Sequence, residues 1–163
     1  MNVALKGLPF TAPVPDAERR RELQLFLKQA RLRFRSLELL NLAFSHRSFA
    51  NEQADGTDSN ERLEFFGDSV IGLVVSEHLL TALPDKNEGD MAKIKSFVVS
   101  EDTLAGIAMR LRLDNFILIG RGEEYSGGRS KKALLADAME AIIGAHYLDS
   151  GFKAARAFVR ALF

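Results

Sequence analysis

Hydrophobic side chains recur along this chain with the spacing of amphipathic helices. Leu23, Phe26, Leu27 and Ala30 stand at i, i+3, i+4 and i+7, which places one apolar stripe on a helix. Similar stripes predict about seven helices that begin near residues 17, 36, 60, 87, 100, 132 and 151, with caps at Ser36, Asn87 and Ser100. No segment alternates with period two long enough to build a sheet, so we expect an all-α fold.

The beginning of the chain differs from the rest. Three of its four prolines, Pro9, Pro13 and Pro15, lie in the first sixteen residues, and no sustained period runs through them. We therefore expect residues 1–18 to form an arm that packs loosely or becomes ordered on contact. Residues 19–163 have the length of one ordinary domain. Within them, the polar and glycine-containing residues 51–60 and 120–129 are expected to be loops.

Composition narrows the class of protein. With 47% hydrophobic and 27% charged residues, the chain is too apolar for a disordered tail. It contains no cysteine, which excludes a disulfide scaffold, a thiolate zinc site and a cysteine nucleophile. No apolar run approaches the roughly 20 residues of a membrane span, and no signal pattern opens the chain, so we expect a cytoplasmic protein without a membrane partner. The balance of 22 basic and 22 acidic residues argues, at first sight, against a nucleic-acid partner.

The helix expected from residue 60 carries the most informative acids. Glu61, Glu64 and Asp68 fall within about 60° of one another on one face of it. Most of its other positions are apolar, as in a buried helix, so these acids do not form an ordinary solvated stripe. Clustered carboxylates in a partly desolvated place either take up protons or need a cation between them.

A second apolar helix repeats this pattern. Asp137 and Glu140 are the only charged residues between positions 133 and 144, and their i, i+3 spacing puts them on one side. The two acidic patches would face each other if the helices pack together. Their oxygen-only ligand set is the one that Mg²⁺ prefers, and Mn²⁺ can substitute. The alternative is that ordinary salt bridges neutralise the acids, with Arg62 and Lys132 as candidate partners.

Five separated segments contain recognisable sequence motifs: SHRS at 45–48, NERLEFFGD at 60–68, EGDM at 88–91, GEEYSGGR at 122–129 and LADAMEAIIG at 135–144. Together they closely resemble the ribonuclease III family, the endonucleases that cut double-stranded RNA. The resemblance implies an all-helical endonuclease domain that works as a homodimer, each subunit cutting one strand. It further implies divalent-metal-activated water, 5′-phosphate and 3′-hydroxyl products with two-nucleotide 3′ overhangs, and a role in rRNA and mRNA processing.

The resemblance also assigns roles to individual acids. The positions that match the family's principal metal-binding acids are Glu64, Asp68, Asp137 and Glu140, and we take Asp68 and Glu140 as the catalytic pair. Glu61 and Glu88 match two accessory acids, although each would also suit the first turn of its helix without any such role.

Other residues receive roles outside the acidic centre. Phe65 matches an aromatic residue that plugs a pocket in the partner subunit, and packing in its own core is the alternative. Gly67, Gly72 and Gly144 would allow helices to approach closely. RNA contacts are expected on the basic first helix and on the loop that ends with Arg129, Lys131 and Lys132, where a solvated face is the alternative.

Two rival functions remain open. A catalytically silent relative would bind RNA without cutting it, but this chain keeps all six acids. A helical, metal-dependent nucleotide pyrophosphohydrolase would lack the NERLEFFGD wording and the Gly-Gly-Arg loop. Bacterial family members usually continue into a double-stranded-RNA-binding domain, and we expect this chain to be a truncated catalytic domain rather than a naturally short mini-ribonuclease III.

The charge balance changes once the six acids are assigned to a metal site. Without them, the chain has 22 basic and 16 acidic residues, so its overall neutrality no longer argues against an RNA substrate.

Overall fold

A computed structural model describes residues 2–5, 7–54 and 56–163. Nine α-helices occur in this part of the chain: α1 (Ala17–Ala30), α2 (Leu37–Ala43), α3 (Arg47–Glu52), α4 (Glu61–Ala82), α5 (Glu88–Val98), α6 (Glu101–Arg110), α7 (Arg121–Tyr125), α8 (Lys132–Ser150) and α9 (Phe152–Leu162). Two 3₁₀ turns span Leu113–Asn115 and Gly128–Ser130. The predicted all-α fold is confirmed. Two helices lie beyond the predicted seven. α7 replaces part of the expected loop 120–129, and α3 lies mostly before the expected loop 51–60. Both are too short to show a periodic signal.

The predicted caps determine where several helices begin. The Ser36 hydroxyl accepts the Leu39 N–H at 3.1 Å, and the Asn87 side chain accepts the Asp90 N–H at 2.9 Å. The Ser100 hydroxyl likewise accepts the N–H of Thr103. Each side chain satisfies a backbone donor that the first helical turn leaves free.

The N-terminal arm is ordered where the structure describes it. β1 (Asn2–Ala4) pairs antiparallel with β2 (Thr11–Pro13), and these three-residue strands are too short for alternation to reveal them. The Thr11 N–H donates to the Asp58 carboxylate at 2.7 Å, and Phe10 is buried under the guanidinium of Arg62. At Thr11 and Phe10 the arm is therefore ordered by contact with the domain, the second of the two expectations, rather than loosely packed. Residues 1 and 6 of the arm lie outside the described residues.

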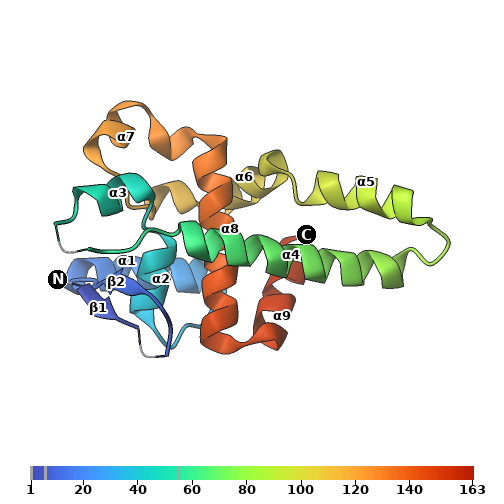
Figure 1. Cartoon of the computed structure of the whole chain (residues 1–163), viewed down its shortest axis with the longest axis horizontal. Helices are drawn as coiled ribbons and strands as arrows, with labels where there is room; N and C mark the ends of the chain where they lie inside the picture. Colours follow the sequence, from blue (N-terminus) through green and yellow to red (C-terminus); the bar gives the residue numbers. More distant parts are fainter. Residues whose placement is uncertain (1, 6, 55) are drawn as a thin grey trace.

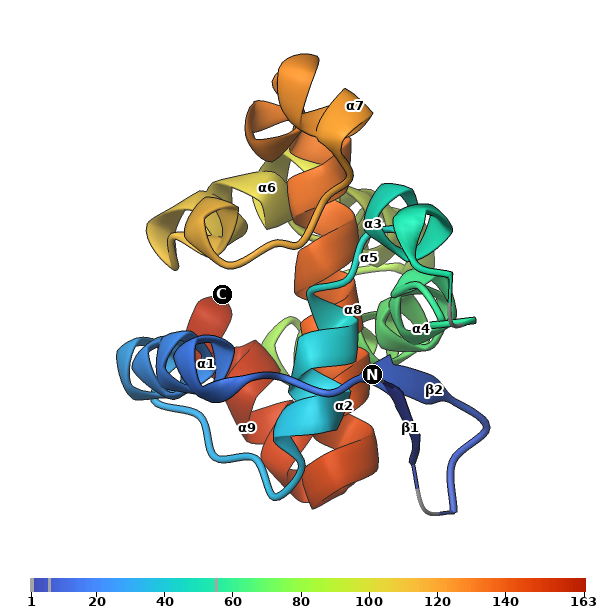
Figure 2. The ribbon, with the colours of Figure 1, turned by 90° about the vertical axis from the view of Figure 1, so that its left-hand side faces the viewer.

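Two long helices cross at the centre of the molecule. Figure 1 shows α8 running across α4, with α5 beside the far half of α4, and Figure 2 shows α1 and the β1–β2 pair on opposite sides of α8. The crossing depends on glycine, because a Cβ on Gly67 would overlap the carbonyl of Glu140 and one on Gly144 would overlap that of Leu63. The predicted close approach at Gly67 and Gly144 is confirmed, and it brings the acidic faces of the two helices together.

α4 also has the length and composition of a membrane span, with a mean hydropathy of 1.3. We expected no such segment. The core helix of a globular domain meets the same criterion, and α4 packs against α8, α5 and α9. The finding is therefore weak evidence and carries no membrane assignment.

Candidate active site

Three of the predicted acids meet where α4 crosses α8. Carboxylate oxygens of Glu64, Asp137 and Glu140 lie within 4.8 Å of one another, and all three side chains are partly buried. Asp68, one turn after Glu64, is exposed and is not part of this group. Glu61 lies in the first turn of α4 and forms an ion pair with Arg47. The structure thus assembles a compact group of three carboxylates, which we call the carboxylate cluster, with two further acids on α4.

Burial and the charges of nearby acids raise the pKa values of all three carboxylates in this cluster. Burial, followed by the charges of Asp68, Glu64 and Asp137, raises the pKa of Glu140 to about 8. Burial and the Asp137 charge raise the pKa of Glu64, and burial together with Glu101 raises the pKa of Asp137. Carboxylates in such a place gain from a cation or from protons.

The salt-bridge alternative does not hold for the carboxylate cluster, because both candidate cations are engaged elsewhere. Arg62 donates to the Pro9 carbonyl at 2.8 Å and stacks over Phe10. Lys132 pairs with Asp102 at 2.7 Å. Neither neutralises the carboxylate cluster. Its oxygen-only donors and raised pKa values fit a hard divalent cation such as Mg²⁺.

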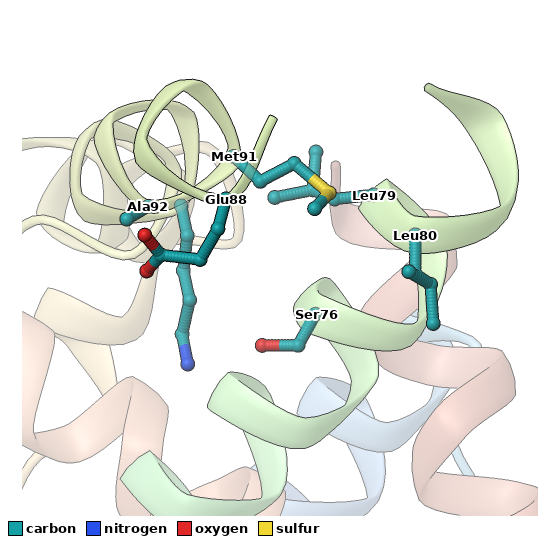
Figure 3. Close-up of a pocket in the computed structure, with 7 residues that line it drawn as sticks. Ser76, Leu79, Leu80, Glu88, Met91 and Ala92 are labelled. Atoms are coloured by element: carbon teal, nitrogen blue, oxygen red, sulfur yellow. The ribbon is translucent and has the colours of Figure 1, made fainter. Parts of the chain in front are cut away.

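Glu88 lies in a different place. It lines a pocket of about 350 Å³ between α4 and α5, together with Ser76, Leu80 and Met91 (Figure 3). Ser76 is twelve residues beyond Glu64, which is about 18 Å along a helix. Within one chain the structure therefore does not bring Glu88 to the carboxylate cluster, and its accessory role remains a prediction.

The three predicted RNA-binding residues have different surroundings. Arg129 donates to the carbonyls of Asp114 and Ile117 and pairs with Glu124, so its guanidinium holds the 121–130 segment in place. Lys131 pairs with Glu123 and Lys132 with Asp102, and both lysines are exposed. The ion pairs of the two lysines are exposed and contribute little to stability, whereas the carbonyl contacts of Arg129 bind it to the fold. RNA contact by all three residues remains a prediction.

The predicted dimer residue is open to solvent. Phe65 is 78% exposed, so it does not belong to the core of its own chain. Leu73 and Leu80 of α4 and Phe97 of α5 are exposed as well. Exposed apolar side chains on two helices that pack together, α4 and α5, indicate a binding surface rather than scattered surface residues.

Sequence reasoning overlooked two residues that organise the site. Asn60 is buried, and its backbone and side-chain N–H groups donate to the carbonyls of Ser45 and Ala43, which fixes the start of α4. Arg47 is the first residue of α3 and pairs with Glu61. Arg47 belongs to one of the matching segments, but only the folded chain shows that its guanidinium faces the acids.

The fold and this site define an all-helical domain with a carboxylate centre suited to divalent cations. A family model described as Ribonuclease-III-like matches residues 36–163. "Ribonuclease 3" of Treponema denticola is 56% identical over 144 residues, which cover 88% of this chain and 58% of that protein. "Ribonuclease 3" of Borreliella afzelii is 50% identical over 146 residues, covering 90% of this chain and 60% of that protein.

Solved structures agree with the sequence comparison. A nuclease domain of ribonuclease III from Campylobacter jejuni, described for flexibility in a region involved in dimer formation, superposes with a TM-score of 0.81 at 38% identity. The match covers 86% of this chain and 94% of that domain. The chain belongs to the ribonuclease III-like family, and it spans about three fifths of the length of these curated relatives.

The raised pKa of Glu140 predicts a pH-dependent stability of the metal-free protein. The folded chain keeps the Glu140 proton up to about pH 8, whereas the unfolded chain releases it near pH 4.5, so the free energy of unfolding falls as pH rises through this window. Glu140→Gln should therefore be more stable than the wild type at pH 8.5, by about 1–2 kcal/mol after allowance for solvent screening. Urea unfolding in EDTA at pH 5 and 8.5 gives the free energy of unfolding of both proteins.

The matched control is Glu18→Gln, which changes an exposed acid on α1. The difference in free energy of unfolding between Glu18→Gln and the wild type should be the same at both pH values. If the corresponding difference for Glu140→Gln does not grow with pH, the raised pKa of Glu140 is contradicted.

Proposed function

We propose that this chain is a metal-dependent endonuclease domain that hydrolyses phosphodiester bonds of double-stranded RNA. The observation that carries the proposal is the carboxylate cluster, which lies at a helix crossing of a ribonuclease III-like domain and in which burial and neighbouring acids raise the pKa of Glu140. In this proposal Glu64, Asp68, Asp137 and Glu140 hold Mg²⁺ or Mn²⁺, with Asp68 and Glu140 closest to the chemistry. The products carry 5′-phosphate and 3′-hydroxyl ends with two-nucleotide 3′ overhangs, and the cellular role is cytoplasmic processing of rRNA and mRNA precursors.

The residues present suit this reaction without a protein nucleophile. Bound divalent ions supply an activated water and offset the charge that develops on the leaving oxygen. The chain's own contribution is to hold the carboxylates in place, through the glycine contact of α4 with α8 and the Asn60 anchor at the start of α4. Lys131 and Lys132 are proposed to contact RNA phosphates, because shape and phosphate contacts dominate recognition of an RNA duplex.

We also propose that two copies pair through the exposed face of α4. At 100° per residue, Phe65, Gly72, Ser76 and Leu80 share one face of this helix. A two-fold axis near Gly72 would place two α4 helices antiparallel and set Phe65 of each against the Ser76–Leu80 end of the other. That end lines the pocket between α4 and α5, which therefore offers a socket for the partner's Phe65.

This arrangement also gives Glu88 a function. Glu88 lines the same pocket, and Phe65 directly follows Glu64 in the chain. A partner's Phe65 in the socket would therefore bring the acids of its α4 toward Glu88. The accessory acid would then act across the interface, which is consistent with its separation from the carboxylate cluster of its own chain.

Incubation with a long RNA duplex tests the proposed function. We expect short duplexes with two-nucleotide 3′ overhangs in Mg²⁺ or Mn²⁺ and intact RNA in EDTA. A DNA duplex of the same sequence and free nucleoside triphosphates serve as control substrates, and both should remain unchanged. Binding of the RNA duplex without cutting in either metal would instead identify a silent relative, and turnover of the triphosphates would identify a pyrophosphohydrolase.

A further inference from the structure

Arg47 begins α3 directly beside the acids of the site. Its backbone position is fixed, because the ring of His46 accepts the Ser48 N–H and so caps the helix. The Ser48 hydroxyl in turn accepts the Gly120 N–H at 2.9 Å, which ties α3 to the segment that leads into α7. The side chain of Arg47 therefore extends from an anchored base.

The guanidinium group of Arg47 is held only by a weak, exposed ion pair. Its Nη1 lies 3.6 Å from Glu61 Oε1, and the two side chains are 67% and 54% exposed. Exposed ion pairs of this kind contribute little to stability, so this one can open readily. Arg62 and Arg129, by contrast, donate to backbone carbonyls and hold parts of the fold together.

The positive charge of Arg47 lies at the edge of the acidic site. Its ion-pair partner Glu61 is three residues before Glu64 in the first turn of α4. A phosphodiester that approaches the site meets the carboxylate cluster together with Asp68 and Glu61. A cation of the chain itself at this edge would reduce that repulsion.

We propose that Arg47 binds a phosphate group of the duplex at the carboxylate cluster and exchanges its ion pair with Glu61 for that phosphate. This inference rests on the proposed function. The guanidinium fork suits a phosphate because it offers two parallel donors, and the flexible, exposed side chain can move from one anion to the other. Arg47 is thus a substrate-binding residue and holds no metal.

The test separates substrate binding from metal binding. In a Glu140→Gln background, where no cutting is expected, adding Arg47→Gln should weaken affinity for a fluorescently labelled RNA duplex by about tenfold. The slope of log affinity against log salt concentration should become shallower by about one. Fluorescence anisotropy at several salt concentrations measures both effects. Arg47→Lys should recover part of the affinity. Calorimetric titration of the Arg47→Gln single variant with Mn²⁺ should show unchanged or tighter binding, because a positive charge near the carboxylates is gone.

Arg160→Gln is the matched control, since it makes the same change at an exposed position on α9. If Arg47→Gln and Arg160→Gln, each in the Glu140→Gln background, bind the duplex with equal affinity, the inference is overturned. Metal-dependent cutting by the wild type would still stand in that case. Parallel loss of duplex and Mn²⁺ binding would overturn it too, because it would show that Arg47 supports the structure of the site. Failure of the Glu140→Gln parent to bind RNA would reject the inference together with the proposed function.

Discussion

Replacing Glu140 with glutamine is expected to lower metal-dependent cutting of an RNA duplex by about a thousandfold or more, while duplex binding survives. Glu140 belongs to the carboxylate cluster, and burial together with the neighbouring acids raises the pKa of its carboxyl group to about 8. Glutamine keeps the shape of the side chain but removes the charge that a divalent cation needs. Single-turnover cutting assays at saturating RNA measure the chemical step, and anisotropy measures binding separately.

Two controls make this result specific. Glu18→Gln on α1 should cut at the wild-type rate, because it changes an exposed acid outside the site. Unfolding measurements should show that Glu140→Gln is at least as stable as the wild type, so loss of cutting cannot come from loss of the fold. Wild-type cutting by Glu140→Gln would remove Glu140 from the proposed site.

The carboxylate cluster could be predicted from sequence because two separate signals agreed. Helical spacing placed Glu64 near Asp68 and Asp137 near Glu140, and the apolar residues around them implied that both helices were buried. Gly67 and Gly144 then permitted the close crossing that the structure contains. Each of these signals is local along the chain, and local patterns of this length are what a sequence displays directly.

The remaining features depend on contacts between distant segments. The sequence predicts an RNA contact for Arg129, and it does not reveal that this guanidinium donates to the carbonyls of residues 114 and 117. Thr11 pairs with Asp58 across 47 residues, which orders an arm without any periodic signal. Arg47 meets Glu61 only when α3 is docked beside α4. Hydrogen bonds and ion pairs of this kind follow from tertiary packing, so sequence spacing alone could not assign them.

Replacing Phe65 with alanine is expected to weaken the proposed dimer by about thirtyfold or more, as for an aromatic residue that fills a pocket of its partner. The side chain is 78% exposed in the single chain, so its removal should leave the stability of the monomer nearly unchanged. Sedimentation velocity over a range of concentrations measures the dimer dissociation constant. Leu25→Ala removes another exposed apolar side chain, on α1, and should leave association unaffected.

A second substitution tests where the two-fold axis lies. Within one chain, a Cβ on Gly72 would meet only the end of the Lys95 side chain at 3.4 Å, so the fold itself does not require glycine there. Gly72→Leu should therefore leave the monomer folded but keep two α4 helices apart, which weakens the dimer as Phe65→Ala does. Because Glu88 is proposed to act across the interface, both variants should also lose cutting at concentrations where they are monomeric. An unchanged dimer in Phe65→Ala and in Gly72→Leu would reject pairing through this face of α4, and undiminished cutting by monomeric variants would reject the shared role of Glu88.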